Sequence, residues 1–377
     1  LILLFFSVRQ YRDIVFGECF FQTNILSCAA HLSPGSAVGI IAIITLVFVL
    51  YILGGLKLWR LPDDRQGYQK YMLWAIGLIV CAILIVPFGS SDMVYYFNAG
   101  KTVLAGVNPF TEMWANNNFF IYPPAVGLGD QYFSYGPVMA YIFTIIYSLS
   151  SDSVIVFILL WKIMLLLCVL LCSKLLTILM RASGVEDVKQ TSLLYIWRLQ
   201  PLILFEVLGS GHFDVIWIAM ILSAMWAAIN RKWLIVFPML AMGVWAKFIP
   251  VFLIPWFVLW WWQGVTRSNW IGQTVRLGFG IAGACAITVF SWMRFWSGTE
   301  VFQTLKLLSK FATDSVFAVT YYSLRPIFDW LITSNPHWIL TRCVHVIVLL
   351  IALYYFYPLI NDTLGVVMRK TQWEIKD

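Results

Sequence analysis

The strongest constraint on this chain is the apolar run at residues 154–178, in which only Lys162 and Lys174 are charged. A helix of about 20 apolar residues is long enough to cross a bilayer. The whole chain is 61% hydrophobic and only 11% charged, whereas soluble domains carry about 25% charged residues. The sequence therefore predicts an integral membrane protein.

Further apolar runs predict an all-α, polytopic transmembrane helix bundle, with about nine to eleven spans, folded as a single membrane domain over residues 1–377. Trp residues near the ends of the runs fit interfacial positions. The predicted spans are 37–59, 71–88, 154–178, 191–208, 213–229, 233–247, 249–263, 270–292 and 338–358.

Lys and Arg side chains predict the orientation of the spans. They gather in the connections 57–70 and 174–189, which the positive-inside rule places in the cytoplasm. Only two spans then fit between these connections, so 136–150 must remain outside as a juxtamembrane or re-entrant helix. This leaves a large outer loop, 89–153, and a second outer segment, 293–337. Loops of this length are usually functional.

The net charge of +7 does not indicate a nucleic-acid partner, because the basic residues are dispersed in short loops. The expected partner surface is the lipid bilayer. The seven Cys residues show no CxxC spacing, and we predict neither a metal site nor a cofactor, although a divalent cation is compatible with the acids discussed next.

Asp92 is the first residue with catalytic potential. It follows the span 71–88 by a few residues and precedes an amphipathic helix expected at about 93–104. A partly desolvated carboxylate there suits a general base. Asp before a helix is also a common N-cap, and the two roles are compatible.

The sequence GSGHFD at 209–214 predicts an outer helix–helix turn that brings His212 and Asp214 toward Asp92. The pair suits orienting an acceptor or binding a metal, although one His and one Asp are few metal ligands. A turn with a helix cap is the structural alternative.

Lys247 interrupts the apolar stretch between Trp233 and Trp262, which makes it a functional-site hypothesis. Its ammonium can bind a phosphate as a point charge, and Arg294 and Arg325 on the second outer segment can complete a phosphate clamp. Snorkelling to the interface is the structural alternative for Lys247. The rigid aromatic turns of the outer loop suit sugar binding or an interfacial position; they contain Asn108, Tyr122 and Tyr135.

Several short motifs occur in a recognisable order over residues 70–262. They are Asp92 followed by Tyr95-Tyr96 and Gly100, then Gly106-Val107-Asn108-Pro109-Phe110, Tyr122-Pro123-Pro124, Tyr135-Gly136-Pro137, Gly211-His212-Phe213-Asp214 and Lys247-Phe248-Ile249-Pro250.

In these motifs the chain resembles the polyprenyl-phosphate-sugar-dependent membrane glycosyltransferases of the GT-C class, especially bacterial mannosyltransferase-like families. Phe213 departs from the usual Asn of the GHND turn, and Asp92 stands alone where many relatives have two acids.

The resemblance implies an inverting hexosyltransferase at the outer face of a bacterial plasma membrane. A hexose, by resemblance mannose, would pass from a polyprenyl phosphate donor to a glycan or lipid-linked acceptor. Asp92 would act as the base, and Lys247, assisted by Arg294 or Arg325, would bind the donor phosphate. The substrate-binding residues would be His212, Asp214, Tyr96, Asn108, Tyr122 and Tyr135.

Two other functions are compatible with a polytopic chain of this kind. A flippase or transporter of lipid-linked sugars would show internal repeats and matching broken helices, which the sequence does not display. A non-catalytic membrane subunit would need the spans but not the clustered Asp, His and Lys residues.

Overall fold

The computed structural model describes residues 46–56, 76–80, 82–83, 92–112, 132–266 and 268–302, with the single positions 346 and 350. These residues form helices and contain no strand, which confirms the all-α prediction. In chain order the helices are Leu46–Leu56, α6 (Asp92–Leu104), α7 (Pro137–Ser150), α8 (Val154–Ala182), α9 (Asp187–Arg198), the π-helix η2 (Ile203–Gly209), α10 (Asp214–Ile229), α11 (Trp233–Ala246), the 3-10 helix η3 (Ile249–Leu253), α12 (Ile254–Gln263), α13 (Trp270–Trp292) and η4 (Thr299–Phe302).

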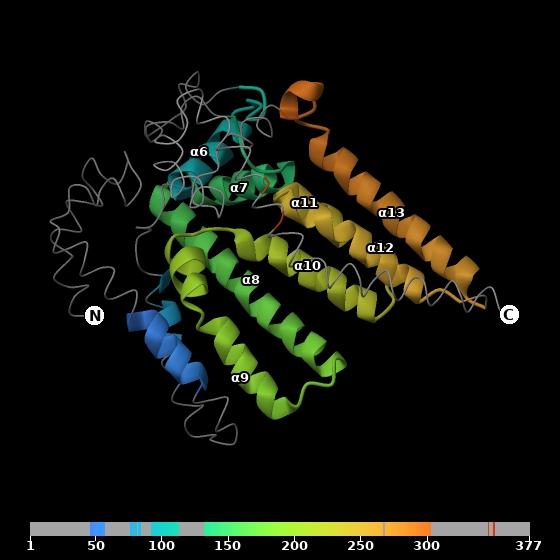
Figure 1. The fold of residues 1–377 in the computed structure, drawn as a ribbon. Coiled ribbons are helices and arrows are strands. Elements are labelled where there is room, and N and C mark those ends of the chain that lie inside the picture. Colours follow the sequence, from blue (N-terminus) through green and yellow to red (C-terminus); the bar gives the residue numbers. More distant parts are fainter. Residues whose placement is uncertain are drawn as a thin grey trace, which may run out of the picture.

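The long helices α8, α10, α11 with α12, and α13 lie side by side, and α6 and α7 lie across one end of this bundle (Figure 1). Neighbours in the bundle pack as α8 on α10, α10 on α11 and α11 on α13. The first residues of α8 and α10 and the last residues of α11 and α13 therefore gather beside α6 and α7. This is the end at which Asp92, His212, Asp214 and Lys247 lie.

Two helices of the described part are long and apolar enough to cross a membrane: α8 with 29 residues and α13 with 23. Both were predicted, at 154–178 and 270–292. Ser153 caps α8 by accepting from Val156 N, and Arg181 lies in its last turn, where a cation complements the helix dipole. Inside α8, fully buried Lys162 donates from Nζ to Ala82 O at 3.0 Å.

A third predicted span, 191–208, is a bent pair in which Ser192–Arg198 and Ile203–Gly209 meet at 46°. The predictions at 213–229, 233–247 and 249–263 correspond to helices of fewer than 18 residues. At 1.5 Å per residue, the 16 residues of α10 extend about 24 Å. Of the other predicted spans, 37–59 and 71–88 are described only in part, and 338–358 lies outside the described residues apart from two positions.

The helices expected in the outer loop are both present. The predicted amphipathic helix at 93–104 is α6, and the predicted short helix at 136–150 is α7. With 14 residues, α7 is about 21 Å long. Rings of the two helices stack, with the centroids of Tyr96 and Phe143 4.5 Å apart. Phe143 also lies 5.0 Å from the ring of Trp161 in α8, so this aromatic core joins α6 and α7 to the bundle.

A close backbone contact sets the position of α7 against α11. Gly136 N donates to Ala246 O at 3.3 Å, and a Cβ at position 136 would lie 1.9 Å from Trp245 O. A carbonyl oxygen of a packed helix cannot move away cheaply. Only glycine therefore allows the segment before α7 to reach the end of α11.

We predict that Gly136→Ala lowers the free energy of unfolding by about 2–3 kcal/mol, because the methyl group forces the two backbones apart. Gly272→Ala is the matched control, since a Cβ there meets nothing within 4 Å and Ala is the better helix former. The thermal unfolding midpoints of both variants in lipid nanodiscs test this. A Gly136→Ala midpoint equal to that of the wild type contradicts the close contact.

Candidate active site

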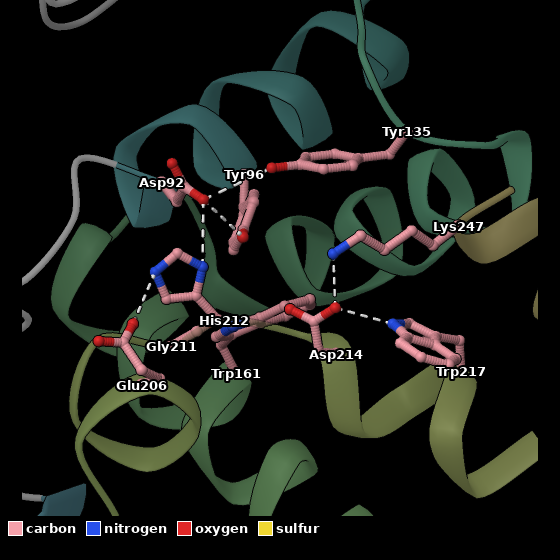
Figure 2. A network of polar contacts seen from close by, with 10 residues as sticks. All are labelled: Asp92, Tyr96, Tyr135, Trp161, Glu206, Gly211, His212, Asp214, Trp217 and Lys247. Atoms are coloured by element: carbon pink, nitrogen blue, oxygen red, sulfur yellow. Dashed lines mark hydrogen bonds and ion pairs between the residues drawn. The ribbon is translucent and has the colours of Figure 1, made fainter. Parts of the chain in front are cut away.

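Asp92 is the first residue of α6, where an acidic side chain is favoured by the helix dipole. Its carboxylate is 28% exposed, and Oδ2 accepts from Tyr96 Oη at 3.1 Å and from Tyr135 Oη at 3.5 Å. Tyr96 comes from the next turn of α6 and Tyr135 from the segment before α7 (Figure 2). The carboxylate is thus held in a defined orientation by two elements.

Both tyrosines keep their hydroxyl protons. Burial, together with the nearby Tyr135 and Asp92, holds the pKa of Tyr96 well above its ordinary value. Burial and the Asp92 carboxylate likewise raise the pKa of Tyr135. Each hydroxyl is therefore a fixed donor to Asp92 rather than a proton acceptor.

The predicted GSGHFD turn connects η2 to α10. Gly211 has φ +88°, and a Cβ there would lie 2.3 Å from Met93 Sδ, so the position requires glycine. Trp161 Nε1 donates to Gly211 O at 2.7 Å, which fixes the turn to α8. As a consequence, the next side chain in sequence, His212, points toward Asp92.

The imidazole ring of His212 lies between two carboxylates (Figure 2). Its Nδ1 is 3.4 Å from Asp92 Oδ2, and its Nε2 is 3.3 Å from Glu206 Oε2. His212 N also donates to Glu206 O at 2.9 Å, so backbone and side chain join the turn to η2. The side chains of Asp92 and His212 are each 28% exposed, and that of Glu206 is 51% exposed. The ring therefore connects a less exposed carboxylate to a more exposed one.

Lys247 ends α11 in extended conformation, and its ammonium points back to the turn. Lys247 Nζ donates to Asp214 Oδ1 at 2.5 Å, and Trp217 Nε1 donates to the same oxygen at 2.8 Å. The side chains of Lys247 and Asp214 are 33% and 38% exposed. The pair is therefore accessible, although it lies at the end of an apolar helix.

Phe213, which lies between His212 and Asp214 in the sequence, packs against Tyr135 and near Lys247. Its ring centroid is 4.6 Å from that of Tyr135, and Lys247 Nζ lies 5.7 Å from it. The residue is 2% exposed. A Phe at this position of the motif thus provides a buried apolar surface that supports Tyr135 and Lys247.

A pocket of about 360 Å³ opens beside the turn, between the bent α9–η2 pair and α10. Its walls are largely apolar, and acidic and imidazole groups line one side. The lining residues are Trp197, Gln200, Leu202, Ile203, Glu206, Val207, His212, Asp214, Val215 and Ile218.

The structure brings together six of the predicted residues: Asp92, Tyr96, Tyr135, His212, Asp214 and Lys247.

Two other predicted residues lie in a different place. Arg294 Nη2 donates to Val103 O, about 16 Å along α6 from Asp92. Asn108 Nδ2 donates to Phe295 O at 2.8 Å, while its Oδ1 accepts from Phe110 N, so it fastens the outer turn to the end of α13. Phosphate binding by Arg294 and substrate binding by Asn108 stay predictions. Arg325 and Tyr122 lie outside the described residues.

Sequence reasoning missed Glu206 as a member of this site. The side chain of Glu206 is half exposed and contacts His212. A π-helix shifts the register of the side chains, and no sequence pattern predicts that shift. The available signal was an acid six residues before a histidine in an apolar context. Within the described residues, no group of three or more His, Cys, Asp or Glu side chains is arranged to hold a metal ion.

These features define a helical protein with helices long and apolar enough to cross a membrane and with a polar site at one end of its bundle. A family model described as alpha-(1->6)-mannopyranosyltransferase, N-terminal domain, matches residues 17–264, more than half of the chain. The chain therefore belongs to this mannosyltransferase family and is a glycosyltransferase. The matched range contains every residue of the site in Figure 2 and ends before Arg294. No curated protein and no solved structure matches the chain.

We predict that Phe213→Ala destabilises the protein by about 3–5 kcal/mol, because it leaves a cavity beneath Tyr135. Phe213→Leu keeps most of the apolar volume and should cost about half as much or less. Thermal unfolding midpoints in nanodiscs measure both. Equal midpoints for Phe213→Ala and the wild type would show that Phe213 does not support the site.

Proposed function

We propose that the chain transfers a mannosyl residue from a polyprenyl phosphate donor to a hydroxyl group of a glycan or lipid-linked acceptor, with Asp92 as the general base. The observation that carries this proposal is the convergence of an oriented acid and an accessible ammonium at one end of a membrane helix bundle. Tyr135 Oη donates to Asp92 Oδ2, and Lys247 Nζ lies 5.7 Å from the ring of Phe213, which packs on Tyr135.

The role of Asp92 follows from its surroundings. The hydroxyls of Tyr96 and Tyr135 hold Oδ2, and the ring of His212 approaches it from a third direction. In the reaction, the acceptor oxygen attacks the anomeric carbon and gives its proton to the Asp92 carboxylate. The bond between the anomeric carbon and the phosphate oxygen breaks, and the electron pair leaves with the polyprenyl phosphate. Attack from the face opposite the phosphate inverts the anomeric carbon.

The role of Lys247 is to bind the donor phosphate and compensate the charge that it gains on leaving. The ammonium is a compact point charge with three donors, of which Asp214 takes one. A cation at the leaving group replaces the general acid that a glycosidase needs. The proposed step therefore requires no cofactor.

A lipid-borne donor suits the position of the site. The spans α8 and α13 expose apolar side chains along their length, including Leu167, Val289 and Phe290. A polyprenyl tail dissolves in the same bilayer, so that its phosphate arrives at the end of the bundle. We propose the outer face for this end, because the connection 174–189, which is rich in Lys and Arg, lies at the opposite end of α8.

A flippase of lipid-linked sugars and a non-catalytic subunit are the alternative functions. Membership of a mannosyltransferase family favours the enzyme over both. Neither alternative requires a carboxylate oriented by two tyrosines and a histidine.

We expect Asp92→Asn to lower kcat by about 10²–10⁴, because the amide cannot accept the acceptor proton. Transfer of radiolabelled mannose from a polyprenyl phosphate donor is measured with purified protein in nanodiscs. Asp152→Asn is the matched control, since Asp152 also accepts from a tyrosine and a lysine at this end of the bundle. Wild-type activity in Asp92→Asn rules out Asp92 as the base.

We expect Lys247→Gln to raise the donor KM by about tenfold to hundredfold, because one charge-assisted hydrogen bond to phosphate is lost. Lys101→Gln is the control, since Lys101 pairs with Asp152 at 3.2 Å in the outer loop. Arg294→Gln in the same assay tests the predicted contribution of Arg294. An unchanged donor KM in Lys247→Gln refutes the phosphate-binding role of Lys247.

A further inference from the structure

His212 contacts two acids that come from different elements. Asp92 belongs to α6 and Glu206 to the π-helix η2, and each lies within 3.4 Å of a different nitrogen of the ring. A neutral imidazole has one N–H and can donate to only one of two carboxylates. With the N–H on Nε2 donating to Glu206, Nδ1 carries a lone pair on the side of Asp92 and can accept a proton from its carboxyl group.

The solvent exposure of the three side chains increases from Asp92 and His212 to Glu206. Asp92 and His212 are each 28% exposed, whereas Glu206 is 51% exposed and lines the 360 Å³ pocket. The other hydrogen-bond partners of Asp92 in Figure 2 are tyrosines, whose raised pKa values keep their protons in place. Asp214, two residues beyond His212, is engaged by Lys247 and Trp217. His212 is therefore the neighbour in this network that can pass a proton onward from Asp92.

We propose that His212 and Glu206 form a proton path that carries the acceptor proton from Asp92 to the pocket between η2 and α10. This inference rests on the proposed function, because it assumes that Asp92 is the base. In it, Glu206 is a positioning residue that acts through His212 and touches neither donor nor acceptor.

The path conserves every proton. The path starts with a neutral His212 whose Nε2–H donates to Glu206, so Nδ1 can accept. After transfer, Asp92 holds the acceptor proton on a carboxyl group. Asp92 then gives this proton to Nδ1 as Glu206 accepts the proton of Nε2, so the ring stays neutral and its proton is now on Nδ1. Glu206 finally releases its proton to water in the pocket, and Asp92 is an ionised base again. The ring is 28% exposed, and it returns to the Nε2–H form by losing one proton to water and gaining one from it.

The π-helix explains how Glu206 reaches the ring. Such helices are rare and often mark functional sites. Here η2 begins after the bend that follows α9, and its Glu206 O accepts the His212 amide at 2.9 Å. Glu206 thus contacts His212 twice: its carbonyl oxygen accepts from the His212 amide, and its carboxylate faces the His212 ring.

The test uses Glu206→Gln, which retains an oxygen that accepts from Nε2 but cannot take up the proton. We expect kcat to fall by about tenfold to hundredfold, with a donor KM within twofold of the wild-type value and an unchanged unfolding midpoint. Glu186→Gln is the matched control, because Glu186 forms an exposed pair with Lys189 away from the site. This control should behave as the wild type.

Chemical rescue separates a proton path from a structural role. Glu206→Ala opens space beside Nε2, so added formate should restore its kcat in a saturable manner, while Glu206→Gln, whose side chain fills that space, should not respond. Wild-type kcat in Glu206→Gln, or failure of formate to rescue Glu206→Ala, overturns the path. Asp92→Asn is measured in parallel: if it is inactive in that case, only the path is refuted, and if it is active, the proposed base is refuted as well.

Discussion

The buried hydrogen bond from Trp161 Nε1 to Gly211 O is the contact on which the site depends. It ties the turn between η2 and α10 to the middle of the aromatic core, and the left-handed conformation of Gly211 sets the direction in which the chain leaves that contact. His212 then faces Asp92, and Asp214 faces Lys247. One anchored turn therefore places both the acid–imidazole group and the acid–ammonium group.

Charge at the end of a membrane bundle has to be paired or wet to be tolerated. The site meets this requirement by placing the Lys247 ammonium beside Asp214 and the imidazole of His212 between Asp92 and Glu206, so that each acid has a polar partner. Aromatic rings fill the space between the pairs. A donor phosphate that approaches Lys247 exchanges one anionic partner for another, and a proton that leaves Asp92 meets a ring already held between acids.

Much of the fold could be predicted from the sequence, because its elements obey local rules. Long apolar runs predicted α8 and α13, and the Gly-containing turn and the charge at Lys247 indicated two helix ends that meet. Long-range packing could not be predicted in this way. The bend before η2, the exposure of Glu206 and the contact of Arg294 with Val103 O depend on how distant helices meet, and no periodicity in one segment reports that. The resemblance to a known family indicated which motifs belong together, and the structure shows that several of their residues lie close to one another.

In the proposed reaction, donor phosphate and acceptor meet between Lys247 and Asp92. The most direct measurement is a structure of Asp92→Asn in a nanodisc with intact polyprenyl phosphate mannose bound. We expect a phosphate oxygen within hydrogen-bond distance of Lys247 Nζ, with the face of the anomeric carbon opposite the phosphate turned toward residue 92. A phosphate bound elsewhere, for example at Arg294 beyond the far end of α6, with the sugar remote from residue 92, would contradict the proposed reaction.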